Sequence, residues 1–113
     1  MQLDIELYIT ETGLCPFNDW FDRLHDAHTC ARIMTRLERL KMGNFGDCKS
    51  LGEGIAELRI HFGPGLRIYY SKIANKIILL LCGGDKGSQT KDINKAKEYL
   101  LEFQKREKRH GKK

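Results

Sequence analysis

The chain has 113 residues, of which 41% are hydrophobic and 31% are charged, and it carries a formal net charge of +5. This length suits one domain with a modest core, and the hydrophobic content excludes an intrinsically disordered chain. No apolar run reaches the ~18 residues of a membrane span, because the longest, IILLLC at 77–82, has the length of a buried strand.

The first part of the chain predicts one strand and two helices. Residues 3–10 alternate apolar and polar side chains, which predicts a half-buried strand with one apolar side: Leu3, Ile5, Leu7 and Ile9. Pro16 suits the first turn of a helix, and that helix has one apolar stripe: Phe17, Trp20, Phe21 and Leu24. Thr29 is the expected N-cap of a second helix, from about Cys30 to Met42, and a glycine-rich loop follows at 43–54.

The stretch from Ile55 to Lys86 predicts three strands and organises the chain. In the first strand, alternation gives one apolar face: Ala56, Leu58, Ile60 and Phe62. Gly63-Pro64-Gly65 turns the chain, and the next strand alternates in the same way from Leu66 to Ser71. If the two strands pair with their apolar faces buried, the opposite, exposed face gathers five side chains: Glu57, Arg59, His61, Arg67 and Tyr69. Such groups can bind and process a phosphate.

The last part predicts a buried strand, a glycine-rich turn and a helix. The strand at 77–82 is apolar throughout, so we expect cover on both faces. The turn at 83–88 superficially resembles a phosphate-binding P-loop, but Lys86 precedes its last glycine, which excludes an NTPase. The turn can still offer backbone N–H groups to an anion, or Asp85 can simply organise it. The helix begins near Thr90 or Asp92 and continues to about Lys105.

The element order β-α-α-β-β-β-α predicts an α+β fold: a small antiparallel sheet of about four strands with two N-terminal helices and one C-terminal helix. Residues 1–104 form the single domain. Residues 105–113, KREKRHGKK, hold six Lys or Arg and one Glu, so they account for the whole net charge and predict a basic, frayed tail. Residues 49–91 carry seven cations and three acids, a local field that favours a polyanion.

Three blocks of the sequence carry a resemblance to a known family: PFNDWFDRL, RIMTRLERLKMGNFGDCKSLGEGIAELRIHFGPGLRIYY and ILLLCGGDKGSQTKDINKA. They resemble the RelE/ParE superfamily of type II toxins, in its HigB-like "addiction module killer protein" branch. The resemblance covers roughly residues 3–100. It implies a small RelE-like α+β toxin that cleaves mRNA, in many members on the ribosome, and that a co-expressed antitoxin neutralises.

The resemblance also implies residue roles. Arg67 matches the arginine that RelE-type toxins place on the scissile phosphate, while Arg59 and Lys86 stand where the family carries further basic residues. The implied reaction is metal-independent attack by the 2′-OH of the RNA, which needs a base, an acid and cations for the phosphorane. Glu57 or His61 would be the base or acid, since no counterpart to a C-terminal Tyr or His of some relatives is clear.

Further expectations concern RNA contacts and partners. We expect four residues to contact RNA beside the catalytic set: Lys49, Tyr69, Lys91 and Gln89. The second helix also carries a basic stripe that is either solvated or touches nucleic acid or an acidic partner: Arg32, Arg36, Arg39 and Lys41. The resemblance implies a small helix-turn-helix antitoxin as partner.

No cofactor or metal is expected, because none of the four cysteines has zinc-ligand spacing. The N-terminal MQLDIELYIT carries acids where a secretory signal needs basic and then apolar residues, so we expect a cytoplasmic protein with no membrane partner.

Two alternatives remain open at the level of sequence. A ParE-like inhibitor of DNA gyrase would share the fold and need no catalytic residues, because a fold does not determine function. A plain RNA-binding module is the other, although the sheet face lacks an aromatic pair spaced for base stacking.

Overall fold

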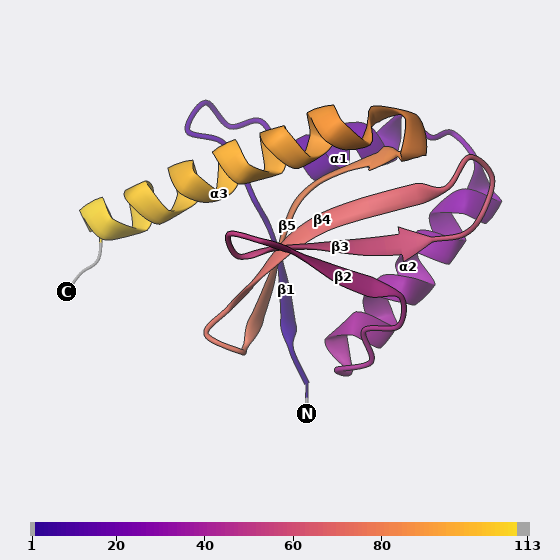
Figure 1. The fold of residues 1–113 in the computed structure, drawn as a ribbon, viewed down its shortest axis with the longest axis horizontal. Helices are drawn as coiled ribbons and strands as arrows, with labels where there is room; N and C mark the ends of the chain where they lie inside the picture. The colour runs from indigo at the N-terminus through magenta and orange to yellow at the C-terminus, as the bar shows by residue number, and fades with distance from the viewer. Residues whose placement is uncertain (1, 111–113) are drawn as a thin grey trace.

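The computed structural model describes residues 2–110 of the chain, and there it is an α+β protein (Figure 1). Its elements are β1 (Asp4–Leu7), α1 (Pro16–Asp22), α2 (Ala27–Lys41), β2 (Cys48–Gly52), β3 (Ile55–Ile60), β4 (Leu66–Ile73), β5 (Ile77–Asp85), the 3-10 turn η1 (Lys86–Ser88) and α3 (Gln89–His110). The strands form one sheet in the order β1-β5-β4-β3-β2. β1 runs parallel to β5, and the other neighbours are antiparallel.

Helices cover both faces of this sheet. On one face, Phe17 of α1 and Ile33, Leu37 and Leu40 of α2 pack into a cluster with strand residues such as Ile68. On the other face, α3 crosses the strands (Figure 1) and buries Ala96 and Leu100 against a second apolar cluster. β5 contributes to both clusters, which confirms the prediction that its apolar run is covered on both sides.

The register of β3 and β4 confirms the predicted faces. Leu58 lies opposite Ile68 in the α1/α2 core, whereas Glu57 lies opposite Tyr69 and Arg59 lies opposite Arg67 on the α3 side. A shift of one residue would place the arginines in the apolar core, so burial of the apolar face determines the register. The polar face is not fully exposed as expected, because the start of α3 covers part of it, and Glu57 and Tyr69 are buried.

The sheet differs from the prediction in its strand count and direction. β2 is a strand within the predicted loop 43–54, and it pairs with β3 across a turn in which Glu53 and Gly54 have φ of 54° and 83°. Positive φ at both central residues is the geometry of a tight hairpin turn. Gly52 and Gly54 therefore belong to a hairpin. The sheet has five strands and is mixed.

The N-terminal elements differ in extent. β1 ends at Leu7, and Tyr8 then turns into the α3 core, where it is 2% exposed, while the expected core residues Leu7 and Ile9 are 37% and 48% exposed. α2 begins at Ala27, three residues before the expected start at Cys30, and Asp26 takes the N-cap position expected for Thr29. Asp and Thr are both favoured at the N-cap, but the Asp26 carboxylate accepts from the Thr29 hydroxyl and makes no side-chain hydrogen bond to the helix backbone.

The C-terminal helix is longer than predicted. α3 continues through residues 105–110, which we expected to be frayed, and positions 111–113 lie outside the described residues. Arg106 donates to the carbonyl of Ile9 at 2.8 Å, and Arg109 pairs with Glu11 at 2.8 Å. These contacts fasten the basic end of α3 to the segment that follows β1. Within residues 2–110, no helix combines the length and the apolar content needed to cross a membrane.

Candidate functional site

A hollow of about 450 Å³ opens at the 61–65 turn, where β3 and β5 end and β4 begins. Residues 59–67 and Lys86 line it, and we call it the cation hollow. It brings together Arg59, Arg67, Lys86 and His61, four of the five predicted catalytic residues. Gly65 lies between two of them, since a Cβ added there would be 3.7 Å from Arg67 Nη1 and 3.8 Å from Lys86 Cβ.

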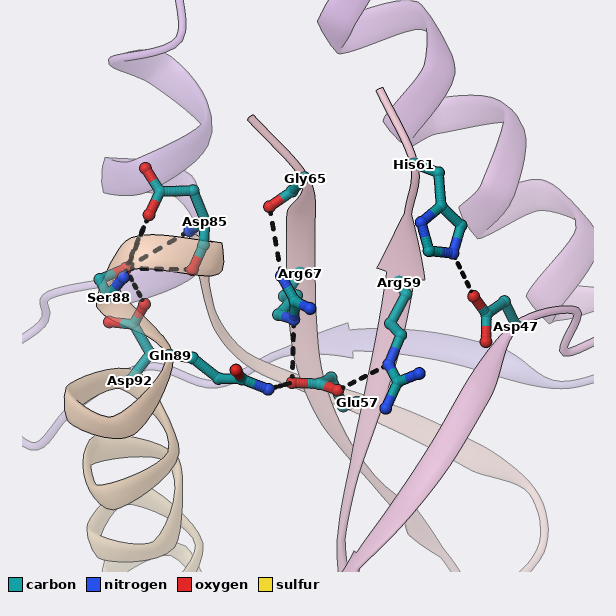
Figure 2. A network of polar contacts seen from close by, with 10 residues as sticks. All are labelled: Asp47, Glu57, Arg59, His61, Gly65, Arg67, Asp85, Ser88, Gln89 and Asp92. Carbon is teal, nitrogen blue, oxygen red and sulfur yellow. Dashed lines mark hydrogen bonds and ion pairs between the residues drawn. The ribbon is translucent and has the colours of Figure 1, made fainter. Parts of the chain in front are cut away.

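The fifth predicted residue, Glu57, lies beneath this hollow and is fully buried. Figure 2 shows its carboxylate between the two arginines, with Arg59 Nε at 3.0 Å from Oε1 and Arg67 Nε at 3.3 Å from Oε2. Gln89, from the first turn of α3, donates to Oε2 at 2.7 Å. Arg59 and Arg67 are directly opposed like charges, an arrangement that repels, and the shared carboxylate offsets that repulsion.

Electrostatics keep Glu57 ionised. Burial acts to raise the pKa of its carboxyl, but the hydrogen bonds from Arg59 and Gln89 and the charge of Arg67 outweigh burial, and the pKa lies below its ordinary value. The bond to Glu57 in turn raises the pKa of Arg59. Two guanidinium groups therefore share a single carboxylate, and with Lys86 at its edge the cation hollow keeps a net positive charge at neutral pH.

The arginines present different atoms to the carboxylate and to the hollow. Glu57 engages the Nε atom of each guanidinium, and the side chains of Arg59 and Arg67 remain 29% and 13% exposed. Arg67 also directs Nη1 at the Gly65 carbonyl, at 3.5 Å. A guanidinium has five N–H donors, so terminal donors remain for an anion in the hollow.

His61 follows the end of β3 and is held by a residue that sequence reasoning missed. Its Nε2 lies 2.5 Å from Asp47 Oδ2, and the hydrogen bond from His61 lowers the pKa of Asp47. The Arg59 N–H donates to the Asp47 carbonyl at 2.9 Å, which fixes Asp47 beside β3. Since the carboxylate accepts, Nε2 carries the proton in the neutral ring and Nδ1 keeps a free lone pair.

The glycine-rich segment 83–88 positions Lys86 and does not form a phosphate loop. Gly83 and Gly84 belong to β5 and pair with Ile68 and Arg67. Asp85 caps η1, accepting from the Ser88 N–H at 3.1 Å, which confirms the simpler reading of Asp85 as the organiser of the turn. Lys86, the first residue of η1, is exposed at the edge of the cation hollow.

The four predicted RNA-contacting residues do not gather in the cation hollow. Tyr69 is 0% exposed beneath α3 and cannot stack on a base there, and burial raises the pKa of its phenol. Gln89 is engaged by Glu57. Lys49 is exposed on β2 opposite Glu57, and Lys91 lines an adjacent hollow of about 580 Å³ that shares Lys86.

Arg36 is a second residue whose role the sequence did not reveal. From α2 it donates to the Arg59 carbonyl at 2.5 Å and to the Phe45 carbonyl at 3.3 Å. A Cβ at Gly46 would lie 2.9 Å from Arg36 Nη2, so a larger residue there would displace the guanidinium, and the φ of 63° also favours glycine. The basic pattern of α2 indicated charge, but only the packing of α2 against β3 assigns Arg36 to holding the backbone of Arg59.

Comparison with known proteins gives one relative. No family model matches the chain. The chain is 47% identical over 81 residues to an uncharacterized protein of Haemophilus influenzae, and the match covers 72% of this chain and 82% of that protein. The chain belongs to the family of that protein. The relative's name states no activity, so the chemistry of this family member is argued from its side chains.

The described part of this family member gathers cations at one place and shows no cluster of metal-ligand side chains. Within residues 2–110, no three His, Cys, Asp or Glu side chains lie close enough together to hold a metal ion. The cation hollow combines two guanidinium groups, an ammonium and an imidazole at one end of the sheet. Such a set can bind a phosphodiester and move a proton beside it.

Proposed function

We propose that this protein is the toxin of a type II toxin-antitoxin module, a RelE-like, HigB-type endoribonuclease that cleaves mRNA on the ribosome. The observation that carries this proposal is the meeting of Arg59, Arg67, Lys86 and His61 in one hollow. The resemblance of the GPG-x-R-x-YY and GGDK-x-SQ segments to RelE/ParE toxins supports it, as does the α+β architecture. A cytoplasmic location and a small helix-turn-helix antitoxin are part of the same proposal.

The two arginines and Lys86 bind the substrate. Arg67 grips two oxygens of the scissile phosphate with its terminal nitrogen atoms, while Arg59 and Lys86 add charge on either side. Glu57 orients this clamp and does not move the proton, because its carboxylate has no exposed surface and is already engaged by three side chains. The clamp is thus assembled before substrate binds, which favours charge that develops in the transition state.

The chemistry is transesterification within the RNA. His61 Nδ1 takes the proton of the 2′-OH, the 2′ oxygen bonds to phosphorus, and the bond from phosphorus to the 5′ oxygen breaks. The products are a 2′,3′-cyclic phosphate and a 5′-hydroxyl, whose proton comes from the Lys86 ammonium. His61 and the segment that bears Lys86 flank Arg67 on opposite sides (Figure 2), and opposite placement of base and acid suits in-line displacement.

The test is a map of transcript 5′ ends after brief induction of the protein. The wild type is expected to generate new 5′ ends within mRNAs, and Arg67→Gln to reduce them by about 100-fold, because one donor to the phosphorane is lost. Lys76→Gln removes an exposed cation from the β4–β5 turn and serves as the matched control. Urea unfolding of each purified variant separates loss of activity from loss of fold.

Two outcomes contradict the proposal. If Arg67→Gln remains folded and cleaves as wild type does, the arginine clamp has no catalytic role. If induction gives a DNA damage response without new 5′ ends, the gyrase-inhibitor alternative replaces the ribonuclease.

A further inference from the structure

A second basic hollow adjoins the cation hollow and shares part of its wall. It measures about 410 Å³, lies along α2, and contains three arginines: Arg32, Arg36 and Arg39. We call it the helix hollow. Ile60 and His61 line both hollows, so the two basic sites follow one another across the end of β3.

The three arginines differ in how much of their charge is available. Arg36 is committed to the carbonyls of Arg59 and Phe45. Arg32 lies with its guanidinium carbon 4.3 Å from the centre of the Phe62 ring, which holds the side chain beside the 61–65 turn. Arg32 and Arg39 are exposed, and neither makes an ion pair with any residue from 2 to 110.

One phosphate group would occupy only one of the two hollows, the cation hollow or the helix hollow. Two adjoining hollows, each with cations and joined by the ring of His61, match a ligand that carries phosphates in series. Residues of α2 line one hollow and the 61–65 turn lines the other, and a flexible single strand can contact both. From the sequence, the basic stripe of α2 could be solvated or could bind nucleic acid or an acidic partner. Its position beside the cation hollow favours nucleic acid.

We propose that the helix hollow is a binding site for single-stranded RNA, and that it holds phosphates next to the one in the cation hollow. This inference rests on the proposed function, since it assigns the neighbouring phosphates to the same RNA strand. Arg32 and Arg39 provide the contacts, and Arg36 supports the wall. The helix hollow thereby contributes affinity and no chemistry, so its loss raises KM and leaves kcat unchanged.

The test measures binding of RNA made uncleavable by 2′-O-methyl groups, as a dinucleotide and as a strand of about 12 nucleotides. The double variant Arg32→Gln/Arg39→Gln is expected to bind the long strand about tenfold more weakly. The slope of the logarithm of the binding constant against the logarithm of the salt concentration should become shallower by about 1.4, because each lost phosphate contact removes about 0.7 from it. Its binding of the dinucleotide is expected to equal that of wild type. Arg23→Gln/Lys76→Gln removes two exposed cations away from both hollows and is the matched control.

The inference is overturned if the Arg32/Arg39 variant binds the long strand as wild type does, or if the control weakens binding equally. It is also overturned if an acidic peptide of polyglutamate binds more tightly than the RNA and loses its binding in the Arg32/Arg39 variant. Binding does not require cleavage, so the two proposals fail separately. A wild type that cleaves but shows no dependence on Arg32 and Arg39 refutes the helix hollow, and one that shows the dependence without cleaving refutes the ribonuclease.

Discussion

At the scale of single residues, the buried carboxylate of Glu57 decides how the cations of the site are held. It accepts from Gln89, pairs with Arg59 and Arg67, and is fully buried. Removing one partner from such a set leaves buried charge without compensation, which costs more than the intact set contributes. Glu57 is therefore a residue whose replacement affects stability and the geometry of the site together.

We predict that Glu57→Gln lowers the free energy of unfolding at pH 7 by about 2 kcal/mol, because hydrogen bonds to a charged group are lost. The folded state depresses the pKa of Glu57, so this stabilisation is present above the unfolded-state value of about 4.3. It is lost as pH falls through the lower folded-state value. Urea unfolding as a function of pH should show wild type and variant converging below about pH 4.

Glu38→Gln is the control for this prediction. Glu38 makes an exposed pair with Lys41 at 3.7 Å on α2, so the same substitution should change stability by less than about 0.5 kcal/mol. A constant difference between wild type and Glu57→Gln across acid pH would show that folding does not lower the pKa of Glu57.

At the scale of elements, β5 is the strand on which helices approach from both sides. A Cβ at Gly83 would lie 2.3 Å from a ring carbon of Trp20, and one at Gly84 would lie 1.8 Å from Asp92 Oδ2. The two glycines thus let α1 and the start of α3 lie directly on the strand. This close approach places η1, and with it Lys86, next to the start of β4.

We predict that Gly83→Ala lowers the free energy of unfolding by about 2 kcal/mol, because the added methyl group displaces a packed indole ring. Trp20 is the single tryptophan of the chain, so its fluorescence should shift in the folded variant. Gly87→Ala adds the same methyl group 3.3 Å from Asp85 Oδ1 and should have a much smaller effect. Equal stability of Gly83→Ala and wild type would mean that α1 does not pack against β5 as described.

At the scale of the whole molecule, the segment that follows β1 is attached to the last turns of α3. Tyr8 donates to Glu102 at 2.5 Å, and Arg106 binds both Glu102 and the Ile9 carbonyl. Hydrogen bonds from Arg106 and then Tyr8 lower the pKa of Glu102 to about 2. The edge strand β1 is short, so these side chains from α3 complete its attachment beyond its pairing with β5.

We predict that Arg106→Ala lowers the midpoint of thermal unfolding by about 3 °C, since a partly exposed pair and a bond to a backbone carbonyl are lost. Lys105→Ala removes an exposed neighbouring cation and should leave the midpoint unchanged. If both variants unfold at the same temperature as wild type, the last turns of α3 contribute nothing to the fold, as the prediction of a frayed tail had implied.

The sequence by itself determined the α+β class, the two faces of β3 and β4, and the placement of Arg59 and Arg67 on one side. These follow from local alternation of apolar and polar residues, because burial of one face leaves a single allowed register. It also indicated Pro16 as a helix start and Asp85 as an organiser of its turn, both confirmed. Such features depend on neighbours in the sequence.

Only the tertiary structure decided which polar groups are buried and which meet. Alternation cannot show that α3 covers Glu57 and Tyr69, that β1 pairs in parallel with β5, or that Asp47 reaches His61 from a glycine-rich segment. Each depends on contacts between residues distant in sequence. These long-range contacts assign different roles to Glu57, His61 and the cations. The reason is that burial and the distance to a partner, and not residue type, determine whether a charged group binds a ligand or stabilises the fold.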